Sequence, residues 1–232
     1  MYGCFAVLVA TALFPAPASS NGDGVGDASQ AAERMQCATE AARSVQRHYE
    51  SVRDLEAHFE QTTRSVALGT GAVATTGRSS GRVVFAKPGR MRWSYQQPQP
   101  SLVVSDGKML WIYDPEASEA QRLPVTQGYL TGAALSFLVG EGDLLAEYQV
   151  SAESCGGEGI ELELIPRTDA SYERLGLRVV RATGEVSATR IVDLFGNVTE
   201  VTFRNLRTNQ DPPASTFGFE PPEGVRVIDL VQ

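Results

Sequence analysis

The chain has 232 residues, a formal net charge of −8 and 42% hydrophobic residues. This composition is typical of a globular protein with enough apolar material for a core, and it excludes general intrinsic disorder. The acidic balance argues against a nucleic-acid partner, because phosphate binding requires a basic surface. No stretch approaches the roughly 20 apolar residues of a membrane-spanning helix. The length allows one large β domain or two smaller domains.

The first residues resemble a secretory signal peptide. A short apolar run at 5–14 precedes the small residues Ala16-Pro17-Ala18, in the order of an h-region and a cleavage site. We therefore expect export, with residues 1–18 removed by cleavage after Ala18. Met1-Tyr2-Gly3 lacks the usual basic residue. A start codon assigned too far downstream would explain this, and an apolar N-terminal helix of the folded protein is the alternative.

A helix is predicted near the start of the mature chain. Residues 19–30 are rich in Gly, Ser and Asp and are expected to form a flexible leader to a single domain over 31–232. From 31 to 51 the sequence is Ala-rich, and apolar residues recur at helical spacings of three and four, at Met35, Ala38, Ala42, Val45 and Tyr49.

After Val52 the pattern changes to that of an all-β unit. Short runs rich in Val, Thr, Phe and Tyr alternate with Gly, Asp, Asn and Pro. Asp106-Gly107 lies between the runs 102–104 and 109–113 and suits a tight hairpin turn with positive φ. Thr183-Gly184 and Gly196-Asn197 are expected to make similar turns. These signals predict one sheet of about ten to eleven strands.

One segment interrupts the β pattern. Residues 128–138 carry no charge, and their apolar residues fall at helical spacing: Leu130, Ala133, Ala134, Phe137 and Leu138. A helix that is apolar nearly all round is expected to contact apolar groups on more than one side. The sequence therefore predicts a second, inserted helix.

The cysteines are consistent with export. Removal of Cys4 with the signal peptide leaves Cys37 and Cys155. In an oxidising compartment this pair is expected to form a disulfide. Two unpaired buried thiols are the alternative.

Signals for catalysis or metal binding are weak. The two histidines, His48 and His58, do not have a zinc-ligand spacing, and no cysteine or third histidine lies nearby. The chain contains no Gly-x-Ser-x-Gly elbow and no phosphate-binding Gly-rich loop. We expect no enzymatic activity, no catalytic residue, no cofactor and no metal.

Three stretches in order resemble the periplasmic outer-membrane lipoprotein carrier family, LolA. They are Val52-x-Asp54-Leu55-x-Ala57-x-Phe59-x-Gln61-Thr62, then Gly81-x-Val83-x-Phe85-x-Lys87-Pro88-x-x-Met91-x-Trp93-x-Tyr95, then Val104-Ser105-Asp106-Gly107-Lys108-x-Leu110-Trp111-x-Tyr113-Asp114-Pro115. The ending Phe217-x-Phe219-x-Pro221-Pro222-x-Gly224-Val225 is also similar. The resemblance spans roughly residues 31–230.

The resemblance implies a mainly β fold. It is an incomplete, unclosed antiparallel β-barrel of about 11 strands, with an N-terminal helix and an inserted helical lid over an apolar cavity. The expected lipid-binding cavity residues are Phe59, Phe85, Met91, Trp93, Trp111 and Tyr113. The expected lid residues are Leu130, Ala134, Leu135, Phe137 and Leu138. For each cavity residue, ordinary barrel core is the alternative.

The resemblance also implies a lid lock. In that family a basic residue before the proline of the second stretch bonds lid-helix carbonyls and holds the empty lid shut. Lys87 occupies this position. Lysine is a point charge without the rigid fork of arginine, so Arg90 or Arg92 is expected to share the role.

The function implied is that of a monomeric periplasmic carrier. It would accept acylated lipoproteins from an inner-membrane ABC transporter of the Lol type and hand them to a LolB-like outer-membrane acceptor. Burial of acyl chains, at about 0.8 kcal/mol per CH₂, would drive entry. Two alternatives have the same fold: a signalling module that senses mislocalised lipoproteins and binds an anti-sigma factor, and a lipid or glycolipid shuttle without protein cargo.

Overall fold

The computed structural model describes residues 23–66, 75–125 and 142–230. These ranges hold a long helix α1 (Asp23–Glu50), a short helix α2 (Leu144–Glu147), a 3-10 turn η1 (Ala214–Phe217) and twelve strands. The strands are β1 (Asp54–Ser65), β2 (Thr75–Ala86), β3 (Arg90–Gln97), β4 (Ser101–Asp106), β5 (Met109–Asp114), β6 (Glu119–Pro124), β7 (Tyr148–Ser154), β8 (Gly159–Pro166), β9 (Tyr172–Val180), β10 (Val186–Asp193), β11 (Val198–Thr208) and β12 (Arg226–Asp229).

The strands form one sheet in the order β12-β6-β5-β4-β3-β2-β1-β11-β10-β9-β8-β7. Its edge strands, β12 and β7, are not paired with each other among the described strands, so the barrel is unclosed. The expectation of a mainly β, incomplete barrel is confirmed, with twelve strands instead of about eleven. One detail was wrong: β12 runs parallel to β6, because the chain crosses the outside of the sheet before it reaches that edge. The predicted inserted helix, 128–138, lies outside the described residues.

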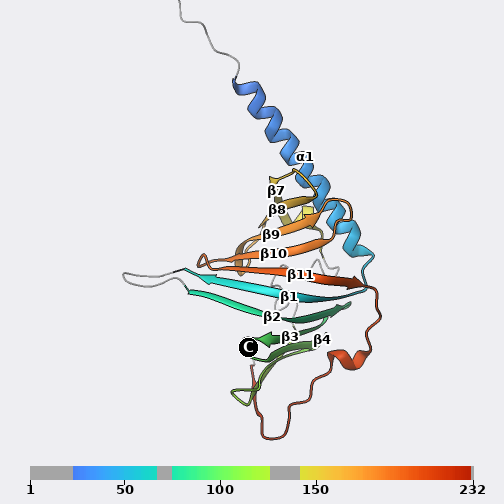
Figure 1. Cartoon of the computed structure of the whole chain (residues 1–232), viewed down its shortest axis with the longest axis vertical. Helices are drawn as coiled ribbons and strands as arrows, with labels where there is room; N and C mark the ends of the chain where they lie inside the picture. The colour runs from blue at the N-terminus through green and yellow to red at the C-terminus, as the bar shows by residue number, and fades with distance from the viewer. Residues whose placement is uncertain (1–22, 67–74, 126–141, 231–232) are drawn as a thin grey trace, which may run out of the picture.

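Helix α1 begins at Asp23, inside the expected leader of residues 19–30. Extending an existing helix requires no new nucleus, so helical structure continues into Gly-containing sequence. Residues 29–36 are exposed, and the buried stripe starts at Ala38. Met35 lies in the helix at the expected spacing, but it precedes the buried stripe and its side chain is 69% exposed. In Figure 1 the N-terminal part of α1 projects beyond β7, which explains the missing cover.

Three contacts fix the packed half of α1 against the turns of the sheet. A disulfide joins Cys37 to Cys155 in the β7–β8 turn. In the β9–β10 turn, a Cβ on Gly184 would overlap the carbonyl oxygen of Ser44, so only glycine allows this approach. The hydroxyl of Tyr49 accepts a hydrogen bond of 3.2 Å from the backbone N–H of Val186. Helix α1 is therefore a fixed wall along one end of the strands (Figure 1).

The face of the sheet toward α1 is here called the inner face. Along β1, Ala57 and Phe59 are buried on this face, while His58 and Glu60 point outward and are exposed. The cross-strand partners of the inner β1 residues continue the row, as in the pairing of Ala57 with Val83. One apolar cluster joins these side chains to the buried stripe of α1. The main core therefore lies on the inner face and is continuous with the buried stripe of α1.

The opposite, outer face is covered by the C-terminal part of the chain over β2 to β6. Here the C-terminal segment, residues 209–229, crosses the sheet from β11 to the far edge (Figure 1). Phe217 in η1 packs with Val84 and Ala86 in a second small cluster. The segment therefore gives Val84 and Ala86 of β2, and Trp111 and Tyr113 of β5, apolar partners on the outer face.

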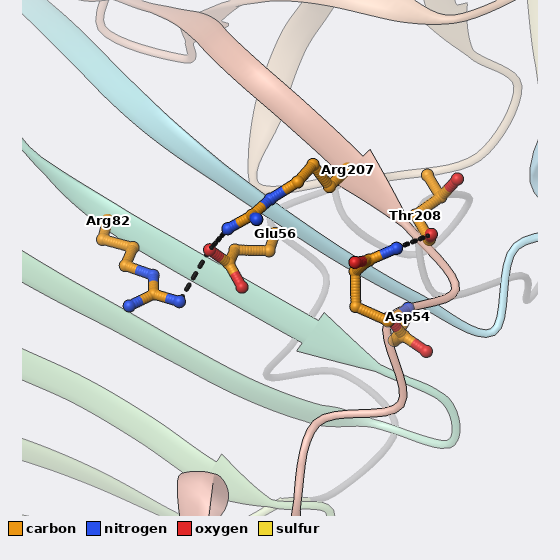
Figure 2. A network of polar contacts seen from close by, with 6 residues as sticks. Asp54, Glu56, Arg82, Arg207 and Thr208 are labelled. Carbon is orange, nitrogen blue, oxygen red and sulfur yellow. Dashed lines mark hydrogen bonds and ion pairs between the residues drawn. The ribbon is translucent and has the colours of Figure 1, made fainter.

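A polar network anchors the beginning of the C-terminal segment (Figure 2). The carboxylate of Asp54, which is only 5% exposed, accepts hydrogen bonds from the backbone N–H groups of Gln210 (2.7 Å) and Asp211 (3.1 Å). Gln210 in turn donates to the carbonyl of Thr208 at 2.9 Å. A buried carboxylate needs such donors, because burial of an unpaired charge costs a large amount of free energy.

Beside this anchor, Glu56 bridges three strands on the outer face (Figure 2). Its Oε1 lies 2.6 Å from the guanidinium nitrogens of both Arg82 on β2 and Arg207 on β11. These two guanidinium groups, Arg82 foremost, hold the pKa of Glu56 below its ordinary value. The outer face therefore carries charges that stay solvated or paired.

Gly81 provides a test of the inner packing. A Cβ at this position would overlap the carbonyl oxygen of Ser94 and lie 2.9 Å from the ring of Phe59. We expect Gly81→Ala to lower the free energy of unfolding by about 1–3 kcal/mol, as overpacking does. Gly77→Ala on the same strand is the matched control, because nothing lies within 4 Å of its Cβ. Urea unfolding of both variants measures the difference, and equal losses would contradict the close packing.

Candidate functional site

An aromatic cluster lies on the inner face of β1, β2 and β3. The ring of Trp93 lies 4.7 Å from that of Phe59 and 5.8 Å from that of Phe85, between centroids. Phe59 also meets Tyr95 edge-on at 5.1 Å. Register places these residues together, because Val83 pairs with Trp93 and Gly81 pairs with both Phe59 and Tyr95. The cluster is a continuous apolar surface of offset rings.

Met91 extends this surface along β3. It is 8% exposed, pairs with Phe85, and belongs to the same core cluster. Its unbranched thioether adapts to contacts of irregular shape. Four of the six expected cavity residues, Phe59, Phe85, Met91 and Trp93, therefore lie together on the inner face.

The aromatic cluster reaches the surface at the end of the sheet far from the C-terminus of α1. There a shallow pocket of about 240 Å³ is lined by Ser79, Tyr95, Ser101 and the β3–β4 turn. The hydroxyl of Tyr95 donates to Oε1 of Gln61 at 3.2 Å, and burial raises the pKa of this phenol. Tyr95 thus belongs both to the aromatic cluster and to the lining of this pocket.

Tyr95 was not among the predicted cavity residues. Its position was available from the sequence, because 91, 93 and 95 follow the period of two that places strand residues on one face. Phe203 on β11 is a second omission. It pairs with Phe59 and packs against the core, but the sequence contains no signal that β11 lies beside β1.

The structure corrects the placement of Trp111 and Tyr113. Both lie on the outer face, where their rings meet Phe219 of the C-terminal segment at 5.5 and 5.2 Å. The guanidinium of Arg122 lies 5.5 Å from the ring centre of Trp111 on the same side. These two aromatics fasten the C-terminal segment, and they do not face the inner cluster.

Lys87 contacts the C-terminal end of α1. Its Nζ donates a hydrogen bond of 2.6 Å to the carbonyl oxygen of Tyr49 in the last turn of the helix. Partial burial lowers the pKa of Lys87, and the carboxylate of Glu50 opposes this effect. A cation at a helix C-terminus also interacts favourably with the helix dipole. Lys87 therefore ties the β2–β3 turn to α1.

The structure corrects the expected lock role of Arg90 and Arg92. Arg92 donates to the carbonyl of Thr216 at 3.2 Å, and the guanidinium of Arg90 lies 5.1 Å from the ring centre of Phe217. Both side chains therefore point to the outer face and hold η1. Side chains alternate between the two faces along β3, so Met91 lies on the inner face and Arg90 and Arg92 lie on the outer face.

The expected lid residues Leu130, Ala134, Leu135, Phe137 and Leu138 lie outside the described residues. Within the described ranges, no three His, Cys, Asp or Glu residues come together as a metal site. No helix in the described part of the chain is long and apolar enough to cross a bilayer. The aromatic cluster of the inner face offers apolar contact area, which suits the binding of an apolar group.

Comparison with known proteins identifies the family. Residues 50–220 match the family described as outer membrane lipoprotein carrier protein LolA. The outer-membrane lipoprotein carrier protein of Cupriavidus pinatubonensis is 33% identical over 169 residues, which cover 72% of this chain and 78% of that protein. That of Ralstonia nicotianae is 35% identical over 154 residues, covering 66% and 70%.

A solved structure supports the fold. The crystal structure of an uncharacterised conserved protein from Thermus thermophilus is 12% identical, with a TM-score of 0.51 over 83% of this chain and 98% of that chain. At this identity the likeness concerns the fold alone. The family match and the two relatives carry the assignment: the chain belongs to the outer membrane lipoprotein carrier protein (LolA) family.

Proposed function

We propose that this protein is a periplasmic carrier that shelters the acyl chains of lipoproteins on the inner face of its sheet. The observation that carries the proposal is the aromatic cluster of Phe59, Phe85, Trp93 and Tyr95 on one face of an unclosed sheet. Trp93 and Tyr95 are only partly buried, so acyl chains would reach them without unfolding of the domain. The name of the related carriers supports lipoprotein as the cargo.

Burial provides the driving force for cargo entry. Each CH₂ group moved from water to an apolar surface contributes about 0.8 kcal/mol, so long acyl chains supply ample free energy. The proposed lid, residues 128–138, would cover the inner face in the empty protein and would have to move aside for the chains. Part of the burial energy would then be spent on opening, which keeps affinity low enough for onward transfer.

Helix α1 serves as the fixed side of the cavity in this proposal. The disulfide at Cys37 and the hydrogen bonds at Tyr49 hold it to the sheet at both ends of its packed half. Movement would therefore be confined to the lid, and Lys87 would stabilise the wall against which the lid closes.

Transfer requires a donor and an acceptor. We propose an inner-membrane ABC transporter of the Lol type as donor and a LolB-like outer-membrane protein as acceptor. Residues 1–18 would direct export to the periplasm and be removed there. The reaction is an exchange of acyl chains between apolar surfaces, and no covalent bond is made or broken.

Capture of the natural cargo tests this function. The full chain, expressed with its leader and a C-terminal affinity tag, is isolated from periplasm, and bound molecules are identified by mass spectrometry. We expect N-terminally acylated lipoproteins. Recovery of free phospholipid or glycolipid alone would favour a lipid shuttle, and a non-acylated periplasmic domain of a signalling protein would favour a regulatory module; either result would overturn the proposal.

A further inference from the structure

The turn between β10 and β11, residues 193–197, exposes two large apolar side chains side by side. Leu194 is 65% exposed and Phe195 is 71% exposed. Val66, at the end of β1, is 42% exposed and lies beside the turn, since its backbone N–H donates to Oδ1 of Asn197 at 3.0 Å. These residues form an apolar point on the surface, here called the apolar tip (Val66, Leu194 and Phe195).

The backbone beneath the apolar tip is rigidly hydrogen-bonded. Oδ1 of Asp193 accepts from the backbone N–H groups of Phe195 (2.8 Å) and Asn197 (2.9 Å). Oδ2 of Asp193 accepts from the side-chain amide of Asn197 at 2.7 Å. These bonds, with the Asn197 amide foremost, lower the pKa of Asp193. The charged residue of the turn is thus directed back into the turn, and the apolar residues are held outward.

The apolar tip lies at the open end of the sheet. Strand β10 begins at Val186, which contacts α1, and ends at the turn, so the tip is at the far end from the contact between Tyr49 and Val186. Figure 1 shows the β10–β11 turn and the end of β1 together at the end of the strands opposite α1. Strand β3 ends on the same side at Gln97, where the pocket beside Tyr95 opens.

We propose that the apolar tip is a membrane-contacting element that inserts Leu194 and Phe195 into the surface of a phospholipid bilayer. A rigid turn places both side chains in the headgroup and acyl boundary without losing conformational freedom on contact. Insertion would bring the open end of the sheet, with its aromatic cluster, toward the lipid surface.

The dimensions of the apolar tip favour a bilayer over a protein partner. A stable protein interface buries roughly 800 Å² on each side, which a tip of three projecting side chains cannot supply. A bilayer requires no complementary shape, and two inserted side chains give a weak and reversible contact. Such a contact suits a protein that has to leave the membrane again.

Charge determines the kind of lipid that is expected. With a net charge of −8, the chain is repelled by anionic lipid surfaces. Binding through the apolar tip should therefore be stronger on uncharged phosphatidylcholine vesicles than on vesicles that contain phosphatidylglycerol. Added salt should strengthen binding to the anionic vesicles, because it screens the repulsion. A basic membrane-binding patch would give the opposite dependence on salt.

A tryptophan placed at the apolar tip tests the proposal. In the full mature chain, Phe195→Trp provides a fluorescent reporter. The parent protein already contains Trp93 and Trp111, so the fluorescence of the added tryptophan is the difference between the variant and the parent. With vesicles of brominated phosphatidylcholine, we expect the added emission to be quenched and shifted to the blue. Val227→Trp on β12 is the control, since Val227 is also a solvent-exposed apolar residue (42%, against 71% for Phe195) but lies on the edge strand, and its added emission should not change.

A loss-of-binding variant completes the test. Leu194→Ser combined with Phe195→Ser should lower partitioning to phosphatidylcholine vesicles by about 100-fold or more, because each of the two apolar side chains that no longer insert accounts for at least about a tenfold factor, with an unchanged melting temperature. Absent quenching at position 195, equal quenching at position 227, or vesicle binding that needs anionic lipid and falls with salt would each overturn the proposal. None of these readouts uses cargo. The membrane contact can therefore be confirmed when the carrier function is not, and the carrier function can be confirmed when the membrane contact is not.

Discussion

Replacing Trp93 by alanine should strongly reduce the binding of a triacylated lipopeptide, whereas the same replacement at Trp111 should leave binding close to that of the parent. The two tryptophans lie on neighbouring parts of one sheet but on opposite faces. Trp93 contacts Phe59 and Phe85 on the inner face, and Trp111 contacts Phe219 under the C-terminal segment. The pair is therefore a matched test of which face holds acyl chains.

The expected size of the effect follows from the lost contact area. A buried aromatic side chain contributes about 1.5–3 kcal/mol of apolar burial, so Trp93→Ala should weaken lipopeptide binding by about 10- to 100-fold. Titration with a fluorescent triacylated lipopeptide measures it. Trp93→Phe keeps a ring in place and should retain most of the affinity, which separates lost contact from a damaged fold.

The outcome at Trp111 provides the control for stability. Loss of its contact with Phe219 should lower the melting temperature of Trp111→Ala. Affinity should stay within about twofold of the parent, because the ring lies on the face opposite the proposed acyl site and distant sites act nearly independently. A reduction of binding in Trp111→Ala equal to that in Trp93→Ala would show that the inner face is not the acyl site.

Alternation along a strand identifies its inner face only where the other face is polar. In β1, Phe59 stands between His58 and Glu60, and the predicted inner position is where the structure has it. Strand β5 is apolar at each position from Met109 to Tyr113, so a period of two carries no signal there. The family resemblance supplied Trp111, but not the face on which it lies.

The orientation of β5 depends on a contact with residues about a hundred positions further along the chain. The return of Phe219 across the sheet gives Trp111 and Tyr113 of β5 their apolar partner on the outer face. The same return explains Arg90 and Arg92, whose partners Phe217 and Thr216 are in that segment. Contacts between segments so far apart in sequence leave no local pattern, so reasoning from periodicity could not find them.

Turns and helix boundaries were partly predictable. The glycines at 107, 184 and 196 have positive φ, as the turn signals predicted. The first hairpin turn differs in detail: β4 continues to Asp106, and the carboxylate of this residue accepts from the N–H groups of Lys108 and Met109, both at 2.8 Å. Helix α1 began earlier than predicted. Composition indicates the helix propensity of each residue, but it does not show that a helix whose C-terminal half is packed can extend toward its N-terminus without a new nucleus. The lid remains a prediction.

Removing the disulfide should lower the free energy of unfolding by about 4 kcal/mol. The bond joins residues 118 positions apart, and cross-linking so long a loop restricts the unfolded chain strongly. The change is Cys37→Ser with Cys155→Ser, and urea unfolding of parent and variant measures the difference. Reductant should destabilise the parent to the level of the variant and leave the variant unchanged.

The structural consequence of this loss should be local. Cys37 stands where the exposed part of α1 meets the packed part, and Tyr49 remains bonded at the other end. We therefore expect hydrogen exchange to rise first in the helix around residues 37–42, while amides near Tyr49 stay protected. A free-thiol count of two in the purified, oxidised parent would contradict the disulfide, and uniform loss of protection would contradict the role of α1 as a wall held at separate points. If α1 is that wall, loosening it at one end should weaken lipopeptide binding even though neither cysteine touches the aromatic cluster.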